Sequence, residues 1–180
     1  MNDPTFLSQC LALGLIEPDQ VASWADGQIA ATDQPPYWLI QLSTQSDGDP
    51  LAVQKLLAEA GAAPQVDDDS YLSLVAGLYS ARADANRAVG LLYERFCIDW
   101  EEMTDLRQEI FVIEDEMGWN ESKGNGRLKR LLKKHLSEFT EQAERLGLKH
   151  NQVAGGIPPP APTTPGKRVR TRRFPEVTEP

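Results

Sequence analysis

The sequence predicts an all-α protein: a single irregular bundle of about six to eight helices over residues 1–150, followed by a disordered tail over residues 151–180. The length of 180 residues suits one ordinary domain and a tail. Apolar residues recur at intervals of three and four between acidic-proline starts and glycine stops, which is the pattern of amphipathic helices. No segment shows the apolar-polar alternation typical of a half-buried strand.

Helix starts in the first half of the chain are marked by an acidic residue before a proline. Asp3 and Asp49 each precede a proline, and a side-chain carboxylate at this place can accept hydrogen bonds from the first helical N–H groups. Pro18 follows Glu17 in the same way. We expect Gly14 and Gly61 to end the first of these helices and the one that starts after Asp49.

The segment DQPPYWLIQLS, residues 33–43, repeats this start and adds a dense apolar cluster. Tyr37, Trp38, Ile40 and Leu42 cannot all lie on one face of a helix, so we expect a short central core helix that is buried on most sides. A surface aromatic contact for a partner is the alternative.

The second half of the chain continues as helices. The acidic triplet at residues 67–69 suits a helix N-terminus, and residues 70–97 form either one long helix or two joined near residues 84–87. The next helix is expected to begin at Asp99, with Glu102 completing a capping-box variant, and to end at Gly118. The last should run from Arg127 to Gly147, after a flexible connection at residues 123–126. The expected buried stripe of residues 99–118 consists of Met103, Leu106, Ile110, Ile113 and Met117.

The tail has a different composition. Seven of the last 26 residues are proline, and few residues there could be buried. We therefore expect residues 151–180 to be disordered, with partial polyproline II character.

The composition argues against an enzyme and against a metal or cofactor site. The only histidines are His135 and His150, and Cys10 and Cys97 are too far apart in sequence for metal-ligand spacing. No nucleophile and base can be paired by spacing. We expect both cysteines to be buried free thiols in a cytoplasmic protein, since no apolar run could cross a membrane and the N-terminus lacks a secretory signal.

Charge changes sign between the body and the tail. Residues 1–150 hold 25 acidic and 13 basic side chains, a formal charge of −12, and residues 151–180 hold two acidic and five basic ones. The body should attract basic partners and repel nucleic acid, while the tail should do the opposite. The sequence indicates no particular oligomeric state.

Residues 99–117 are rich in carboxylates, and residues 123–134 are rich in basic side chains. One interpretation is that two antiparallel helices neutralise each other's solvated faces. The other is that the acidic helix presents a face that binds a basic protein. The residues expected to form this acidic face are Glu101, Asp105, Glu109, Asp115 and Glu116.

A nucleic-acid contact is the alternative interaction. Short basic segments bind phosphates without sequence preference and with steep salt dependence. The expected contacts on the last helix are Lys129, Arg130, Lys133 and Lys134. The expected contacts in the tail are Lys167, Arg168, Arg170, Arg172 and Arg173.

Residues 11–43 resemble a group of small bacterial α-helical proteins of unassigned function. The resemblance rests on a Trp-Ala-Asp helix, here residues 24–26, followed by a Pro-Pro-aromatic-Trp-Leu segment, here residues 35–39. It covers about a fifth of the chain and brings no catalytic residues. Some small acidic helical bacterial proteins are immunity proteins that block a toxin, and on this analogy of size and charge we expect a non-catalytic, immunity- or antitoxin-like interaction module.

Overall fold

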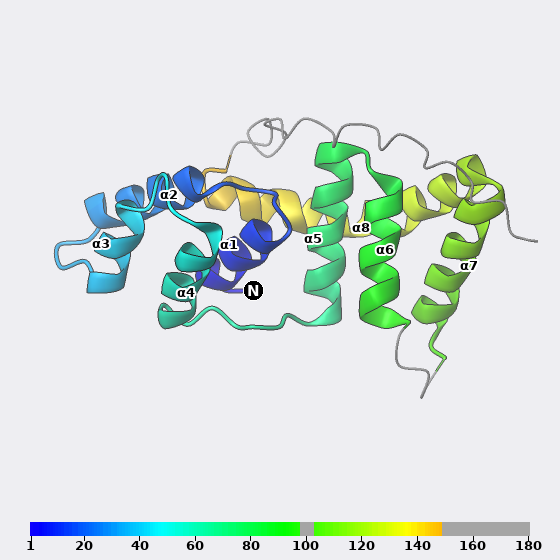
Figure 1. The fold of residues 1–180 in the computed structure, drawn as a ribbon, viewed down its shortest axis with the longest axis horizontal. Helices are drawn as coiled ribbons and strands as arrows, with labels where there is room; N and C mark the ends of the chain where they lie inside the picture. Colours follow the sequence, from blue (N-terminus) through cyan, green and yellow to red (C-terminus); the bar gives the residue numbers. More distant parts are fainter. Residues whose placement is uncertain (98–102, 149–180) are drawn as a thin grey trace, which may run out of the picture.

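The computed structural model describes residues 1–97 and 103–148, and in these ranges the chain forms eight helices and no strand. Figure 1 shows α5, α6 and α7 side by side, α1 to α4 grouped at the other end of the molecule, and α8 running across both groups along the long axis. The fold class is therefore all-α, as expected. The helices are α1 (Asp3–Ala12), α2 (Pro18–Ala30), α3 (Tyr37–Ser43), α4 (Pro50–Glu59), α5 (Asp68–Arg82), α6 (Ala85–Phe96), α7 (Asp105–Trp119) and α8 (Glu121–Arg145).

Two apolar clusters make up the core. The first gathers buried side chains of α1 to α4 with Leu74 and Leu78 of α5 and Phe139 of α8. The second gathers α6, α7 and the first half of α8 with residues on another side of α5, among them Val75. Among the described residues, only α5 and α8 contribute buried helical residues to both clusters, so these two helices join the halves of the molecule.

The crossing of α5 and α8 requires a residue without a side chain. A Cβ atom at Gly77 would lie 2.6 Å from ring atoms of Phe139, which is itself only 2 % exposed. Gly124 is similarly constrained, since a Cβ there would lie 2.8 Å from the backbone nitrogen of Met117. These two glycines let α8 approach α5 and α7 closely.

Most predicted helix ends are confirmed. Pro18 begins α2, Asp49 caps α4 by accepting a hydrogen bond from the Leu51 amide at 3.2 Å, and Gly14 and Gly61 adopt left-handed backbone angles after α1 and α4. Gly147 ends α8 in the same conformation.

The first helix begins at Asp3 as predicted, but its predicted cap and two other predicted starts are wrong. Asn2, not Asp3, caps α1, because its side-chain oxygen accepts from the Thr5 amide at 2.9 Å. The helix expected from Asp99 begins at Asp105, capped by the Thr104 hydroxyl, while residues 98–102 lie outside the described ranges. The expected connection at residues 123–126 is helical, because Asn120 caps α8 at Glu121.

Residues 70–97 form parts of two helices. Ala83 takes a left-handed backbone conformation with φ +52°, which ends α5, and Asp84 then caps α6 by accepting from the Arg87 amide at 2.9 Å. The capping side chain supplies a local alternative to continuing the first helix.

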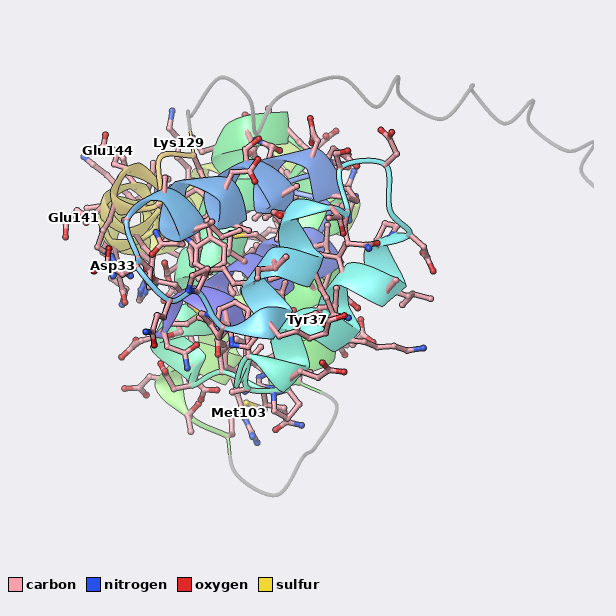
Figure 2. The ribbon with its side chains drawn as sticks, turned by 90° about the vertical axis from the view of Figure 1, so that its left-hand side faces the viewer. Asp33, Tyr37, Met103, Lys129, Glu141 and Glu144 are labelled. Atoms are coloured by element: carbon pink, nitrogen blue, oxygen red, sulfur yellow. The ribbon has the colours of Figure 1, made fainter. Side chains whose placement is uncertain are left out.

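The prediction that α3 is a central core helix is wrong. Leu39 and Leu42 are buried, but Tyr37 is 72 % exposed and Ile40 is 42 % exposed, and Trp38 is half-buried. The reason is position: α3 packs on α2 and α4 at one end of the molecule, so only one of its sides is covered. Figure 2, viewed from that end, shows Tyr37 on the surface.

The Gly77→Ala variant should be less stable than the parent by about 1–3 kcal/mol, because the added methyl group overpacks the α5–α8 crossing. The matched change is Gly90→Ala in α6, where a Cβ meets nothing within 4 Å. It should raise stability by roughly 0.5–1 kcal/mol through helix propensity alone. Urea unfolding of the three proteins measures both effects. Equal stability of the two variants would show that the crossing tolerates a Cβ.

Candidate protein-binding surface on α6 and α7

Four of the five residues expected to form the acidic face are within the described ranges. Asp105 and Glu109 lie one turn apart on α7 and are exposed, and Asp115 is also exposed. Glu101 lies outside the described ranges. Glu114, which was not among the expected residues, is exposed on the same helix.

Glu116 does not belong to this face. It is only 3 % exposed and points toward α8, where Lys123 Nζ lies 2.6 Å from Oε1 and Arg127 Nε lies 2.8 Å from Oε2. The Arg127 contact is an ion pair without hydrogen-bond alignment. The hydrogen bond from Lys123 holds the pKa of Glu116 below its ordinary value, against the opposing effect of burial, and the positive charge of Arg127 lowers that pKa further.

Charge neutralisation between α7 and α8 is therefore confined to one corner. The two helices meet at Asn120, and Figure 1 shows them crossing rather than lying antiparallel. The remaining acidic residues of α7 are left exposed.

Two aromatic side chains lie among these carboxylates, and no sequence pattern singled them out. Phe111, Asp115 and Trp119 follow at intervals of four and so share one side of α7. Trp119 is 65 % exposed and Phe111 is 40 % exposed. Their position opposite the buried Ile110 and Ile113 on the helical wheel is the feature that could have revealed them. We define the α7 surface by Asp105, Glu109, Phe111, Glu114, Asp115 and Trp119.

The exposed Trp119 ring is held in place. Its Nε1–H donates to the Asp115 carboxylate at 3.1 Å, and Lys123 Nζ lies 5.4 Å from the ring centroid in a cation–π contact. Phe111 contacts the Tyr93 ring of α6, with 6.5 Å between centroids. The α7 surface thus presents aromatic groups whose orientation is set before any partner binds.

A groove of about 450 Å³ lies between α6 and α7, beside this surface. Val89, Tyr93 and Met117 provide its apolar lining, and Glu94 and Glu114 are the carboxylates in it. The volume falls within the range of roughly 300–1,000 Å³ that is usual for ligand pockets. We call it the α6/α7 groove.

Two glycines keep this groove open. Gly90 of α6 and Gly118 of α7 both line it, and at each position an added Cβ would meet nothing within 4 Å. Unlike Gly77 and Gly124, they are not needed for helix packing. Gly126 of α8 also has no neighbour there but does not line the α6/α7 groove.

The predicted basic contacts on α8 are all exposed, and none of them forms an ion pair within the described ranges. They are Lys129, Arg130, Lys133 and Lys134. Figure 2 shows Lys129 on the same outer side of α8 as Glu141 and Glu144, so acidic residues continue this side toward the C-terminal end of the helix. The predicted tail contacts, residues 167–173, lie outside the described ranges.

The other reactive side chains are buried. Cys10 and Cys97 are free thiols, as predicted, and burial raises the pKa of both. His135 is also buried, and burial lowers its pKa. In the described part of the chain, no group of three or more His, Cys, Asp or Glu residues could hold a metal ion, and no helix is long and apolar enough to cross a membrane.

No protein-family model, curated protein or solved structure matches this chain. The resemblance of residues 11–43 to small bacterial helical proteins therefore stays a prediction.

Glu116→Gln should lower the free energy of unfolding at neutral pH, because Lys123 and Arg127 lose their buried counter-charge. The folded-state pKa of Glu116 is lowered, so its stabilising contribution is complete above the ordinary value of 4.5 and is lost as the pH falls through the folded-state pKa. The stability difference between parent and variant should therefore shrink in acid. Urea unfolding at a series of pH values measures it, with the exposed Glu114→Gln as control; a difference independent of pH would contradict the ion-pair origin.

Proposed function

We propose that this protein is a non-catalytic binding module that holds a basic segment of a protein partner on the α7 surface and in the α6/α7 groove. The observation that carries the proposal is Trp119, an exposed tryptophan fixed by Asp115 among carboxylates. Tryptophan is enriched among the residues that dominate binding energy, and an exposed aromatic ring on a monomer surface is available for such a contact.

Pre-organisation favours binding through this surface. A side chain that is already ordered loses less conformational freedom when it is covered, so more of the contact energy appears as affinity. The hydrogen bond from Trp119 to Asp115 and the ring contact of Phe111 with Tyr93 supply this order. Covering these rings would also remove apolar surface from water.

The chemistry of the surface defines the partner. Asp105, Glu109 and Asp115 are solvent-exposed carboxylates that would steer a basic protein toward the site and fix its register. The groove adds apolar walls with Glu94 and Glu114 beside them. The best fit is a segment that carries lysine or arginine on either side of one apolar side chain.

An immunity- or antitoxin-like inhibitor is the most concrete form of this function. Such a protein needs a rigid acidic surface and no catalytic residues. We place it in the cytoplasm, because both cysteines are buried free thiols that suit a reducing compartment.

Replacing Trp119 with alanine should weaken the complex about 30-fold or more, the effect of losing one binding hot spot. The partner is first captured from the protein's own lysate after nuclease treatment, identified by mass spectrometry, and titrated by calorimetry. Tyr37→Ala is the matched control, since Tyr37 is an equally exposed aromatic residue at the other end of the molecule. Equal effects of the two changes, or a partner without basic segments, would contradict the proposal.

The groove is tested separately with Gly90→Leu. The leucine should fill the groove without a steric clash at its Cβ, so folding is retained while binding weakens. Gly126→Leu in α8, where a Cβ also meets nothing within 4 Å, should leave binding unchanged.

The second candidate function is contact with nucleic acid. It is supported by the exposed basic side chains of α8, which form no ion pair within the described ranges. They lie on successive turns, and the five basic residues of the tail would add to them. The acidic residues that follow on α8 limit the length of duplex that this side could cover.

Salt dependence separates this function from protein binding. If Lys129, Lys133 and Lys134 contact phosphates, affinity for a labelled duplex should fall steeply between about 50 and 200 mM salt. Glutamine at these three positions, or deletion of residues 157–180, should flatten the slope by nearly one unit per lost contact. Fluorescence anisotropy measures the slope, and Lys55→Gln on α4 is the control. No measurable duplex binding at 50 mM salt would exclude this function.

A further inference from the structure

A second groove lies at the end of the molecule opposite the α7 surface. It consists of two hollows of about 550 and 460 Å³ that share Trp24, Gln28 and Arg145 in their linings. Its walls come from α1, α2, α3 and the C-terminal end of α8, and Figure 1 shows this end far from α7. We call it the Trp24 groove.

The groove brings together the two sequence pieces on which the bacterial resemblance rests. Trp24 comes from the Trp-Ala-Asp helix, and Pro36, Trp38 and Leu39 come from the Pro-Pro-aromatic-Trp-Leu segment. With Pro4 of α1, the first hollow is therefore lined by two tryptophans and two prolines, beside polar residues. Aromatic-lined grooves of this composition are the usual receptors for proline-rich segments.

Two hydrogen-bond donors in this groove have no acceptor. Trp24 is only 9 % exposed, and within the described residues neither its Nε1–H nor the buried Nε2 amide of Gln20 donates to any group. An unpaired buried donor is costly and points to a missing acceptor. Both donor nitrogens are covered by protein atoms, so a neighbouring side chain must move before an acceptor from outside can reach them. The exposed Gln28, which lines both hollows, is the candidate for this movement.

The chain itself leads into this groove. Leu148, the last residue before the undescribed segment, lines the second hollow. Ten residues later, at residue 158, the sequence reads PPPAP, and residues 157–165 contain five prolines and no charge. An extended chain spans up to about 3.3–3.6 Å per residue, so this segment can reach either hollow.

We propose that the Trp24 groove binds residues 157–165 of the same chain as a polyproline II strand, whose carbonyl groups accept hydrogen bonds from Trp24 and Gln20. A polyproline II strand makes no internal hydrogen bonds, so its carbonyls are free to serve these donors. The same-chain segment is the occupant because a short link gives it an effective concentration of about millimolar at the groove. This site is independent of the α7 surface and of the proposed function.

A spin label in the tail of the full-length protein tests the proposal. A cysteine introduced by Thr163→Cys can be labelled selectively, since Cys10 and Cys97 are buried. Attached to a nitroxide, it should cause loss of the backbone amide signals of Gly27, Trp38 and Leu146 in ¹H–¹⁵N spectra. Signals of Gly90 and Gly118, in the α6/α7 groove, should be retained.

Two further samples identify the occupant. Gly27→Leu should restore the lost signals, because Gly27 lines the second hollow and a Cβ there meets nothing within 4 Å; Gly126→Leu should not restore them. In a mixture of spin-labelled chains with unlabelled ¹⁵N chains, the signals should be retained. Loss in the mixture would assign the groove to the tail of a second copy and overturn the proposal.

The indole proton of Trp24 provides the hydrogen-bond readout. Serine in place of Pro158, Pro159, Pro160 and Pro162 should accelerate its exchange with solvent by removing the strand that supplies the acceptor. Unchanged exchange, with amide signals retained around Gly27 in the spin-labelled chain, would mean that water serves the buried donors and would overturn the proposal. If the spin label instead causes loss of the amide signals around Gly90, the tail lies at the α6/α7 groove, and this result would also overturn the proposal.

Discussion

The close crossing of α5 and α8 at Gly77 and Phe139 is the constraint on which the rest of the structure depends. The two apolar clusters lie on different sides of α5, and α8 supplies Leu128 and Leu132 to one and Phe139 to the other. A side chain at position 77 would push α8 away and open both clusters at once. Because cores pack at nearly crystalline density, such a shift cannot be absorbed locally.

The orientation of α7 follows from the same helix. Met117 lies against Gly124, and the buried Glu116 carboxylate joins Lys123 and Arg127 at the corner where α7 turns into α8. A buried charge that lost these partners would be strongly destabilising, so these contacts favour the observed rotation of α7 about its axis. That rotation directs Ile110 and Ile113 inward and leaves Trp119 and Asp115 on the surface.

Several local features of this fold can be predicted from sequence, whereas the non-local ones cannot. The cap at Asp49 and the end of α4 at Gly61 depend on residues within one turn, so the local sequence pattern was enough to predict them. Glu116 looked like one more solvated acid, because its burial depends on residues seven and eleven positions away across a helix corner. The apolar α3 segment looked central, but tertiary position leaves Tyr37 in water. The roles of glycines also depend on tertiary position. Gly77 and Gly90 have similar sequence neighbours, but only Gly77 faces a packed helix that leaves no room for a side chain.

Glycines inside helices show where this fold gives up stability without a packing reason. Each costs about 1 kcal/mol relative to alanine, a notable fraction of the roughly 5–15 kcal/mol that stabilise a typical domain. Gly27, Gly90 and Gly118 have room for a side chain, and each lines a groove. Natural proteins commonly hold such a cost where a surface must stay open for function. At Gly27, Gly90 and Gly118, alanine would stabilise the helix but begin to fill a groove, whereas at Gly126 it would only stabilise α8.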